Sequence, residues 1–227
     1  MPVHLQNEIT KLKRMILALS GVVEENVRKA VSSIERRDAA IAGEVIKADL
    51  EIDQMEVDVE EECLKALALH QPVAVDLRFI VAVLKINNDL ERIDDLAVNI
   101  AKRALFICRH PAVQAPFEFG EMCRKTLNML RYCLDGLMKM DDERARLVRA
   151  MDDEVDDINR HAYQKVFAAM RENPDNAEVL FSYLSASRHL ERIADYATNI
   201  SEDIIYMING KIVRHGADEA EDRAGKS

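Results

Sequence analysis

The chain of 227 residues is 48% hydrophobic but only 5% aromatic, with no tryptophan, seven glycines and five prolines. So few turn-forming residues leave little room for β-hairpins, and the composition is typical of an all-α protein with an aliphatic core. The formal net charge of −10 argues against a general nucleic-acid-binding protein, because such a protein needs a basic surface to neutralise phosphates.

The cysteines and the apolar runs indicate a cytoplasmic protein. No CxxC pair and no zinc-finger spacing is present, so we interpret the cysteines as core thiols in a reducing compartment. The first ten residues lack the apolar core of a signal peptide. The run Phe79–Leu84 is far too short to span a bilayer, so we expect membrane association only through a partner. The four cysteines are Cys63, Cys108, Cys123 and Cys133.

The first part of the chain predicts three long helices. Apolar residues at steps of three and four predict an amphipathic helix over 5–35. Asp38 is suited to cap a second helix that reaches residue 69. The segment His70-Gln-Pro72 then interrupts the pattern, and Pro72 suits the first turn of a third helix over 73–108.

A proline-containing linker at 109–117 precedes a second set of three helices. We expect these helices over 117–139, 142–171 and 175–209, with Gly210 ending the last one. The predicted domains are therefore a first three-helix repeat over 1–110 and a second over 111–213. Residues 214–227 form a polar tail that we expect to be disordered.

The third and sixth helices contain a repeated stretch. Residues 85–100 (KINNDLERIDDLAVNI) return one hundred positions later as 185–200 (SASRHLERIADYATNI). Leucine, glutamate, arginine and isoleucine at 90–93 recur at 190–193, and further identities follow. A fixed-offset repeat describes the architecture. We expect two pseudo-symmetric three-helix bundles, placed side by side and related by a pseudo-twofold axis.

Each repeat contains carboxylates four residues apart, which stack on one face of a helix. In the repeated stretch these are Glu91 with Asp95 and Glu191 with Asp195. Second pairs occur on the preceding helices, and these are Asp49 with Asp53 and Asp152 with Asp156.

Counting from the helix breaks predicts that the pairs face each other. Asp53 precedes Pro72 by the same number of positions as Glu91 follows it. In the second half, Asp156 precedes Pro174 by nearly the same number of positions as Glu191 follows it. In antiparallel helices, residues equally far from the break come to the same level.

Two interpretations of these carboxylates stay open. Oxygen-only clusters suit hard or intermediate cations such as Mg, Mn and Fe. Alternatively, the acids are surface residues in salt bridges with Arg92, Arg192 and nearby lysines.

Catalysis is not expected. Carboxylate-bridged di-iron oxidases place Glu-x-x-His on bundle helices, and this pattern is absent from the chain. The counterpart of His189 in the first repeat is Asp89, so that histidine does not recur. No P-loop, nucleophile elbow or zinc-hydrolase motif is present.

The segment QPVAVDLR, followed by LKINNDLERIDDLAVNIA, resembles the PhoU family of phosphate-uptake regulators, and LERIADYATNI matches that family's internal duplication. The resemblance covers residues 5–212. It implies two three-helix bundles, a homodimer and a cytoplasmic location. It also implies a negative regulator of the phosphate-starvation response and of phosphate uptake. Such a regulator links the ATPase subunit of the phosphate ABC transporter to a PhoR-type sensor histidine kinase.

The resemblance also implies a use for the acids. Some family members hold multinuclear iron or zinc clusters on E/D-xxx-D motifs, while others were seen without metal. Carried over residue by residue, the motif acids are Glu91, Asp95, Glu191 and Asp195, with Asp49, Asp53, Asp152 and Asp156 as companions. The second half has NPDNAEVL in place of QPVAVDLR, so we do not expect the two halves to behave identically.

Three functional hypotheses follow. The favoured one is a non-enzymatic adaptor that binds protein partners and no nucleic acid. The alternative is a carboxylate-bridged metalloenzyme or a metal-storage helical bundle, against which the missing histidine ligands count. A purely structural bundle would leave the repeated polar motif without a reason.

Overall fold

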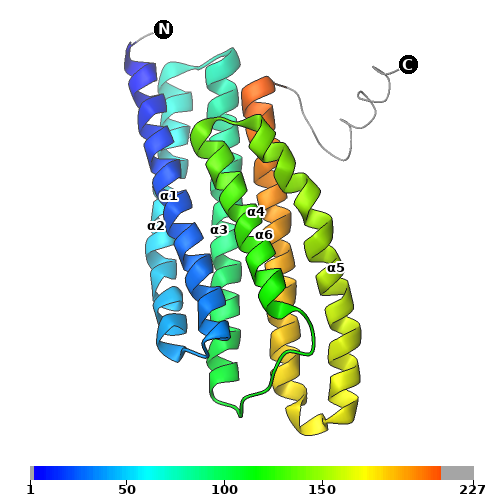
Figure 1. Cartoon of the computed structure of the whole chain (residues 1–227). Helices are drawn as coiled ribbons and strands as arrows, with labels where there is room; N and C mark the ends of the chain where they lie inside the picture. The colour runs from blue at the N-terminus through cyan, green and yellow to red at the C-terminus, as the bar shows by residue number, and fades with distance from the viewer. Residues whose placement is uncertain (1–2, 211–227) are drawn as a thin grey trace, which may run out of the picture.

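The computed structural model describes residues 3–210, and all regular elements in this range are helical (Figure 1). The predicted all-α fold with six long helices is confirmed. The elements are α1 (Val3–Glu35), α2 (Ala39–His70), α3 (Ala74–Cys108), α4 (Phe119–Lys139), α5 (Asp142–Glu172), a 3-10 turn η1 (Pro174–Asn176) and α6 (Ala177–Asn209).

Side-chain caps and a left-handed residue define the helix ends. Asp38 accepts hydrogen bonds from the backbone N–H groups of Ala40 and Ile41 at the start of α2, as predicted. These bonds satisfy donors that have no partner within the helix. Gly210, with φ of 70°, ends α6 and donates its N–H to the carbonyl of Tyr206, which also agrees with the prediction.

The start of α3 differs from the prediction. The helix begins at Ala74, so Pro72 lies before it and not in its first turn. The chain leaves α2 through Gln71 in the left-handed conformation, with φ of 44°. Val73 is then extended, with φ of −129° and ψ of 161°. Pro72 and Val73 therefore lie in the turn between α2 and α3, and helical geometry resumes at Ala74.

Two other helix starts also lie slightly later than predicted. The fourth helix begins at Phe119 instead of 117, and the sixth begins at Ala177 instead of 175. Ahead of α6, Pro174 occupies the first position of η1, where its missing N–H costs nothing. The predicted polar tail at 214–227 lies outside the described residues.

The helices form two groups of three that meet along α3 and α6. Helices α1, α2 and α3 pack on one another, as do α4, α5 and α6. Helices α2, α3, α6 and α5 lie side by side in this order, with α2 and α5 at the two edges (Figure 1). Helix α1 packs on α2 and α3, and α4 packs on α5 and α6. The two acidic helix pairs thus lie within one layer.

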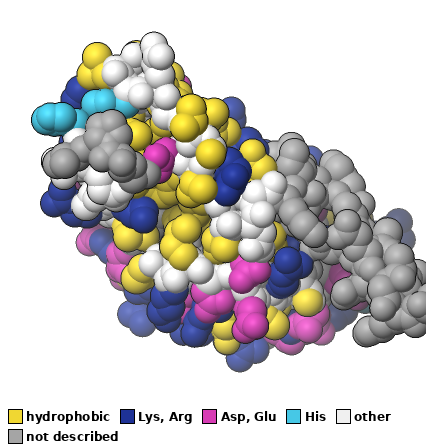
Figure 2. Space-filling model, turned by 90° about the horizontal axis from the view of Figure 1, so that it is seen from above, with side chains coloured by type: hydrophobic (Ala, Val, Ile, Leu, Met, Phe, Trp, Pro, Cys, Tyr) yellow, Lys and Arg dark blue, Asp and Glu magenta, His cyan; other side chains and the backbone are white. Residues whose placement is uncertain are grey.

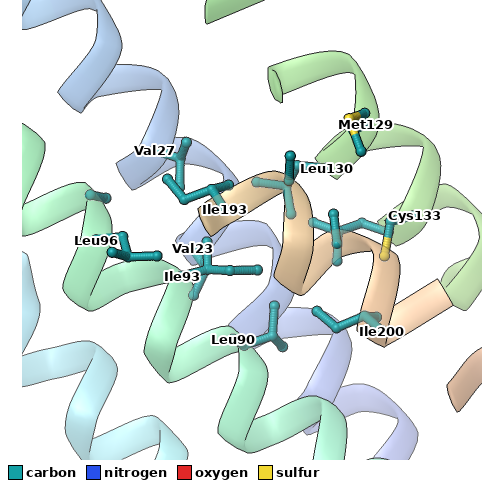
Figure 3. Packing of buried hydrophobic residues seen from close by; sticks show 14 of the residues in the cluster. Val23, Val27, Leu90, Ile93, Leu96, Met129, Leu130, Cys133, Ile193 and Ile200 are labelled. Atoms are coloured by element: carbon teal, nitrogen blue, oxygen red, sulfur yellow. The ribbon is translucent and has the colours of Figure 1, made fainter. Parts of the chain in front are cut away.

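The repeated apolar residues form the core between the two groups. Ile93 and Ile193 are fully buried, as are Leu90 and Ile200. Side chains from α1, α3, α4 and α6 meet there, and Figure 3 shows Ile93 and Ile193 among them. Each such side chain contributes roughly 1.5–3 kcal/mol by leaving water. The repeated apolar residues of α3 and α6 therefore stabilise the junction between the two groups as well as each group of three helices.

A polar contact also joins α3 to α6. The ammonium group of Lys85 lies 2.9 Å from the Asp203 carboxylate, joining α3 to α6. A cleft of about 570 Å³ adjoins this pair and is lined by residues of both helices, among them Arg92 and Tyr196.

Hydrophobic side chains are exposed at the end of the bundle that holds the α2–α3 and α4–α5 connections. Figure 2 looks onto this end and shows them interspersed with charged groups. They include Leu69, Val73, Val75, Met138 and Met140.

The four cysteines are free thiols. Three of them are buried and Cys108 is half-buried, which agrees with their predicted role in the core.

Candidate metal centre

The second repeat brings three predicted acids together. Asp152 and Asp156 lie one turn apart on α5, and Asp195 lies opposite them on α6. One carboxylate oxygen from each lies within 4.8 Å of those of the other two. This spacing is close enough for a single cation to contact all three side chains.

Two oxygens of this cluster lack hydrogen-bond partners. Oδ1 of Asp152 and Oδ1 of Asp156 are both buried without a hydrogen-bond partner. A buried anionic oxygen without a partner is costly. Burial, followed by the charges of Asp156 and Asp195, raises the pKa of Asp152 to about 6. Burial and the charge of Asp156 also raise the pKa of Asp195. The donor set therefore fits an oxygen-preferring cation.

Glu191 lies one turn before Asp195 on α6 and lines a cleft together with Asp156. Burial raises its pKa, and the charges of Asp195 and Asp156 add to the effect. It is not part of the group of three closely spaced oxygens. Its place makes it a fourth candidate donor at the edge of the cluster.

The first repeat gathers its four acids more loosely. Burial and the charges of Asp53 and Asp95 raise the pKa of Asp49. Burial and the charges of Asp95, Asp53 and Asp49 raise the pKa of Glu91, against the effect of Arg92. The charges of these four acids therefore act on one another between α2 and α3. Among residues 3–210, however, only the second repeat places three donor oxygens within 4.8 Å of one another.

Salt bridges leave most of this charge uncompensated. Within the described part of the chain, Glu91 alone among the eight acids has an ion-pair partner, since its carboxylate lies 3.6 Å from Nε of Arg92. Lys102 acts on Asp49 only at longer range. The alternative interpretation, surface acids held in salt bridges, therefore describes Glu91 but not the other seven.

Sequence reasoning missed Asp94, which lies on the buried side of the first cluster. Its side chain is only 2% exposed, and Oδ1 accepts a hydrogen bond of 2.6 Å from the amide of Asn26. Oδ2 is buried without a partner. Burial raises the pKa of Asp94 to about 7, and the charges of Asp49 and Asp53 contribute. The one available signal was the break in the repeat, since Ala194 occupies the equivalent position.

Glu56 is a second acid that the sequence did not single out. Its carboxylate accepts a hydrogen bond of 2.8 Å from the amide of Asn87, which joins α2 to α3. Burial, together with the charges of Glu60 and Glu91, raises its pKa.

His189 does not join the second cluster. Burial, together with the charges of Arg103, Arg192 and Arg188, lowers its pKa to about 4. Its ring nitrogen Nε2 lies 3.4 Å from the Ser185 hydroxyl. The histidine therefore stays neutral in a basic environment near α3, which agrees with its exclusion from the predicted donors.

The fold and its acidic sites define a class of duplicated helical-bundle proteins with one carboxylate cluster in each half. The PhoU domain family matches residues 16–104 and 119–204. A Pseudomonas putida protein named "phosphate-specific transport system accessory protein PhoU homolog" is 36% identical over 209 residues. The match covers 92% of this chain and 82% of that protein. The chain belongs to the PhoU family.

Solved structures agree with this assignment. The crystal structure of PhoU from Pseudomonas aeruginosa superposes with a TM-score of 0.86 at 33% identity, covering 91% of this chain and 99% of that one. The phosphate transport system regulatory protein PhoU from Streptococcus pneumoniae gives 0.85 at 27% identity, covering 93% and 100%. In residues 3–210, no helix has the length and apolar character needed to cross a bilayer.

Proposed function

We propose that this protein is a cytoplasmic, homodimeric and non-enzymatic negative regulator of phosphate uptake and of the phosphate-starvation response. It acts as an adaptor between the ATPase subunit of the phosphate ABC transporter and a PhoR-type sensor histidine kinase. The observation that supports this role is membership of the PhoU family over nearly the whole described chain. Relatives named as accessory proteins of phosphate-specific transport, at up to 36% identity, support it further.

The geometry suits an adaptor. Helices α2 and α5 form the two edges of a four-helix layer (Figure 1) and present long faces to solvent. The layer is also divided into two groups that meet along one helix pair. A partner could therefore engage each edge without competing with the other.

We further propose that the carboxylate clusters hold metal ions, as multinuclear iron or zinc, or as Mg or Mn. In the second half the donors are Asp152, Asp156, Glu191 and Asp195, and in the first half Asp49, Asp53, Glu91 and Asp95. A bound cation supplies positive charge that neutralises these carboxylates. Because each cluster spans two helices, this neutralisation joins α5 to α6 and α2 to α3. The alternative of a metalloenzyme or a metal-storage bundle is not favoured, since the relatives are transport accessory proteins.

Deletion of the gene in its host, with an alkaline-phosphatase reporter, tests the regulatory role. We expect the reporter to be expressed in phosphate-rich medium after deletion and to be repressed again when the intact chain is restored. A reporter that stays repressed after deletion would contradict the proposal. Pull-down with the transporter ATPase and with the kinase then tests each partner separately.

A further inference from the structure

Helix α2 exposes a straight row of apolar side chains. Leu50, Val57 and Leu64 are 78%, 41% and 53% exposed. They are seven residues apart, so they lie in nearly one line along the helix. This α2 stripe (Leu50, Val57 and Leu64) extends over about 21 Å at 1.5 Å per residue. The core-facing residues of α2, which include Val45, Ile52 and Val59, lie on the opposite side.

The fold itself does not require apolar residues at the first two positions of this stripe. The repeat aligns α2 with α5 at an offset of 103 residues, which matches core Val45 with Val148 and Ile52 with Val155. At the same offset, Leu50 corresponds to Asp153 and Val57 to Arg160. Both of these α5 residues are exposed. The same helix in the same fold therefore accepts charged residues at these two positions, while Leu64 corresponds to the exposed Phe167.

Carboxylates border the α2 stripe on both sides. Glu60 follows Val57 by three positions and Glu61 follows it by four, so they flank the row. Between positions 49 and 62 the helix has eight acidic residues and neither lysine nor arginine. Within residues 3–210, neither Glu60 nor Glu61 has an ion-pair partner. The corresponding stretch of α5 includes Arg160 and Lys165.

We infer that the α2 stripe is a docking surface for a basic amphipathic helix of a partner protein. The apolar face of that helix covers Leu50, Val57 and Leu64, and its lysines and arginines pair with the flanking carboxylates. Charged positions beside an apolar seam select the partner in this way in helix pairs.

Charge argues against the other occupants. A second copy of α2 would place one acidic border against another, and directly facing like charges are unfavourable. An anionic membrane surface attracts basic segments and repels acidic ones. Of these three occupants, only a basic amphipathic helix can both cover the apolar side chains and pair with the carboxylates beside them.

The inference rests on the proposed adaptor function for its biological reason, but the binding test does not depend on that function. The first probe is a synthetic peptide of leucine and lysine, about three heptads long, with leucine at the first and fourth positions of each heptad. A matched peptide has glutamate in place of lysine. Full-length protein is titrated with each labelled peptide. We expect binding of the lysine peptide, weakened by added salt, and no binding of the glutamate peptide.

The decisive variant is Leu50→Asp/Val57→Arg, which introduces the residues of α5 and leaves the net charge unchanged. We expect it to weaken lysine-peptide binding by about tenfold or more. The matched control is Leu147→Asp/Phe167→Arg, because both residues lie on α5 and both are 54% exposed. We expect this control to bind the peptide as the wild type does. Equal loss in both variants, or no loss in the α2 variant, would overturn the inference.

A cellular experiment identifies the occupant. A photo-crosslinking amino acid is placed at position 57 or, as the control, at the equivalent position 160 of the full chain. We expect position 57 to label a Lys- and Arg-rich segment with apolar residues every three to four positions. Labelling of a second copy of this chain or of lipid, or equal labelling from position 160, would refute a docking surface for a basic helix. The deletion reporter would still test the adaptor function independently.

Discussion

The side-chain amide of Asn26 donates a hydrogen bond of 2.6 Å to Oδ1 of Asp94, joining α1 to α3 behind the first carboxylate cluster. The pair places an acid that is 2% exposed next to Asp49 and Asp53. In the second repeat Ala194 takes the place of Asp94. The first half therefore holds one more carboxylate in its interior than the second half does.

Asp94 should make stability depend on pH. Its pKa rises from 3.8 to about 7 on folding, mainly because of burial. The folded protein thus binds more protons than the unfolded chain between these values, and stability falls as pH rises through this window. We expect Asp94→Asn to stabilise the metal-free protein by about 1–2 kcal/mol at pH 8 and to have little effect near pH 4. Urea denaturation in the presence of a chelator measures this.

The control for this prediction is Glu51→Gln, which changes an exposed acid on α2. It should leave the pH dependence unchanged. An Asp94→Asn protein that loses stability between pH 5 and pH 8 as steeply as the wild type would show that another group causes the loss.

Binding of a metal ion by the carboxylate clusters should raise the stability of the folded protein. Raised pKa values, about 6 for Asp152, mean that ionisation of these acids costs stability as pH rises. A divalent cation at about one hundred times its dissociation constant should raise the Tm by about 5–10 °C at pH 8, and by less at pH 5. Elemental analysis of the purified protein should find iron, zinc or manganese.

Two double variants separate the clusters in that experiment. Glu191→Ala/Asp195→Ala should lose the metal of the second half, and Glu91→Ala/Asp95→Ala should lose that of the first. Wild-type protein that is prepared without chelators and contains no metal would count against the metal proposal, and would favour the acids as docking residues.

The guanidinium group of Arg78, near the start of α3, lies close to Gly210 at the end of α6. A Cβ atom added at Gly210 would lie 3.2 Å from Cζ of Arg78, and the φ of 70° there suits glycine. Gly210→Ala should therefore cost about 1–2 kcal/mol of unfolding free energy. Part of this cost comes from the contact, so Gly210→Ala should cost less in an Arg78→Ala background. Equal costs in both backgrounds would assign the whole effect to the backbone.

The repeated isoleucines should contribute strongly to the stability of the junction between the bundles. Ile93 and Ile193 are fully buried, so Ile93→Ala and Ile193→Ala should each cost about 2–5 kcal/mol in urea denaturation. Leu147→Ala, at a site that is 54% exposed, should change stability by less than about 0.5 kcal/mol. Costs below about 1 kcal/mol for both isoleucines would show that the two bundles are joined elsewhere.

The six helices and the duplication could be predicted from the sequence alone. These features depend on contacts three and four residues apart and on caps such as Asp38. The errors fell at the helix starts near Val73 and Ala177, where the path of a turn decides how many residues precede the helix.

Which acids meet and which side chains stay exposed depends on how the helices pack in three dimensions. The oxygens of Asp152, Asp156 and Asp195 converge while those of the first half stay apart, because this depends on rotamers and on the approach of two helices. The burial of Asp94 depends on Asn26, which is distant in the sequence and lies on another helix. The exposure of Leu50 likewise follows from the place of α2 at the edge of the layer. Helical periodicity cannot show this, because it does not tell which neighbours cover a face.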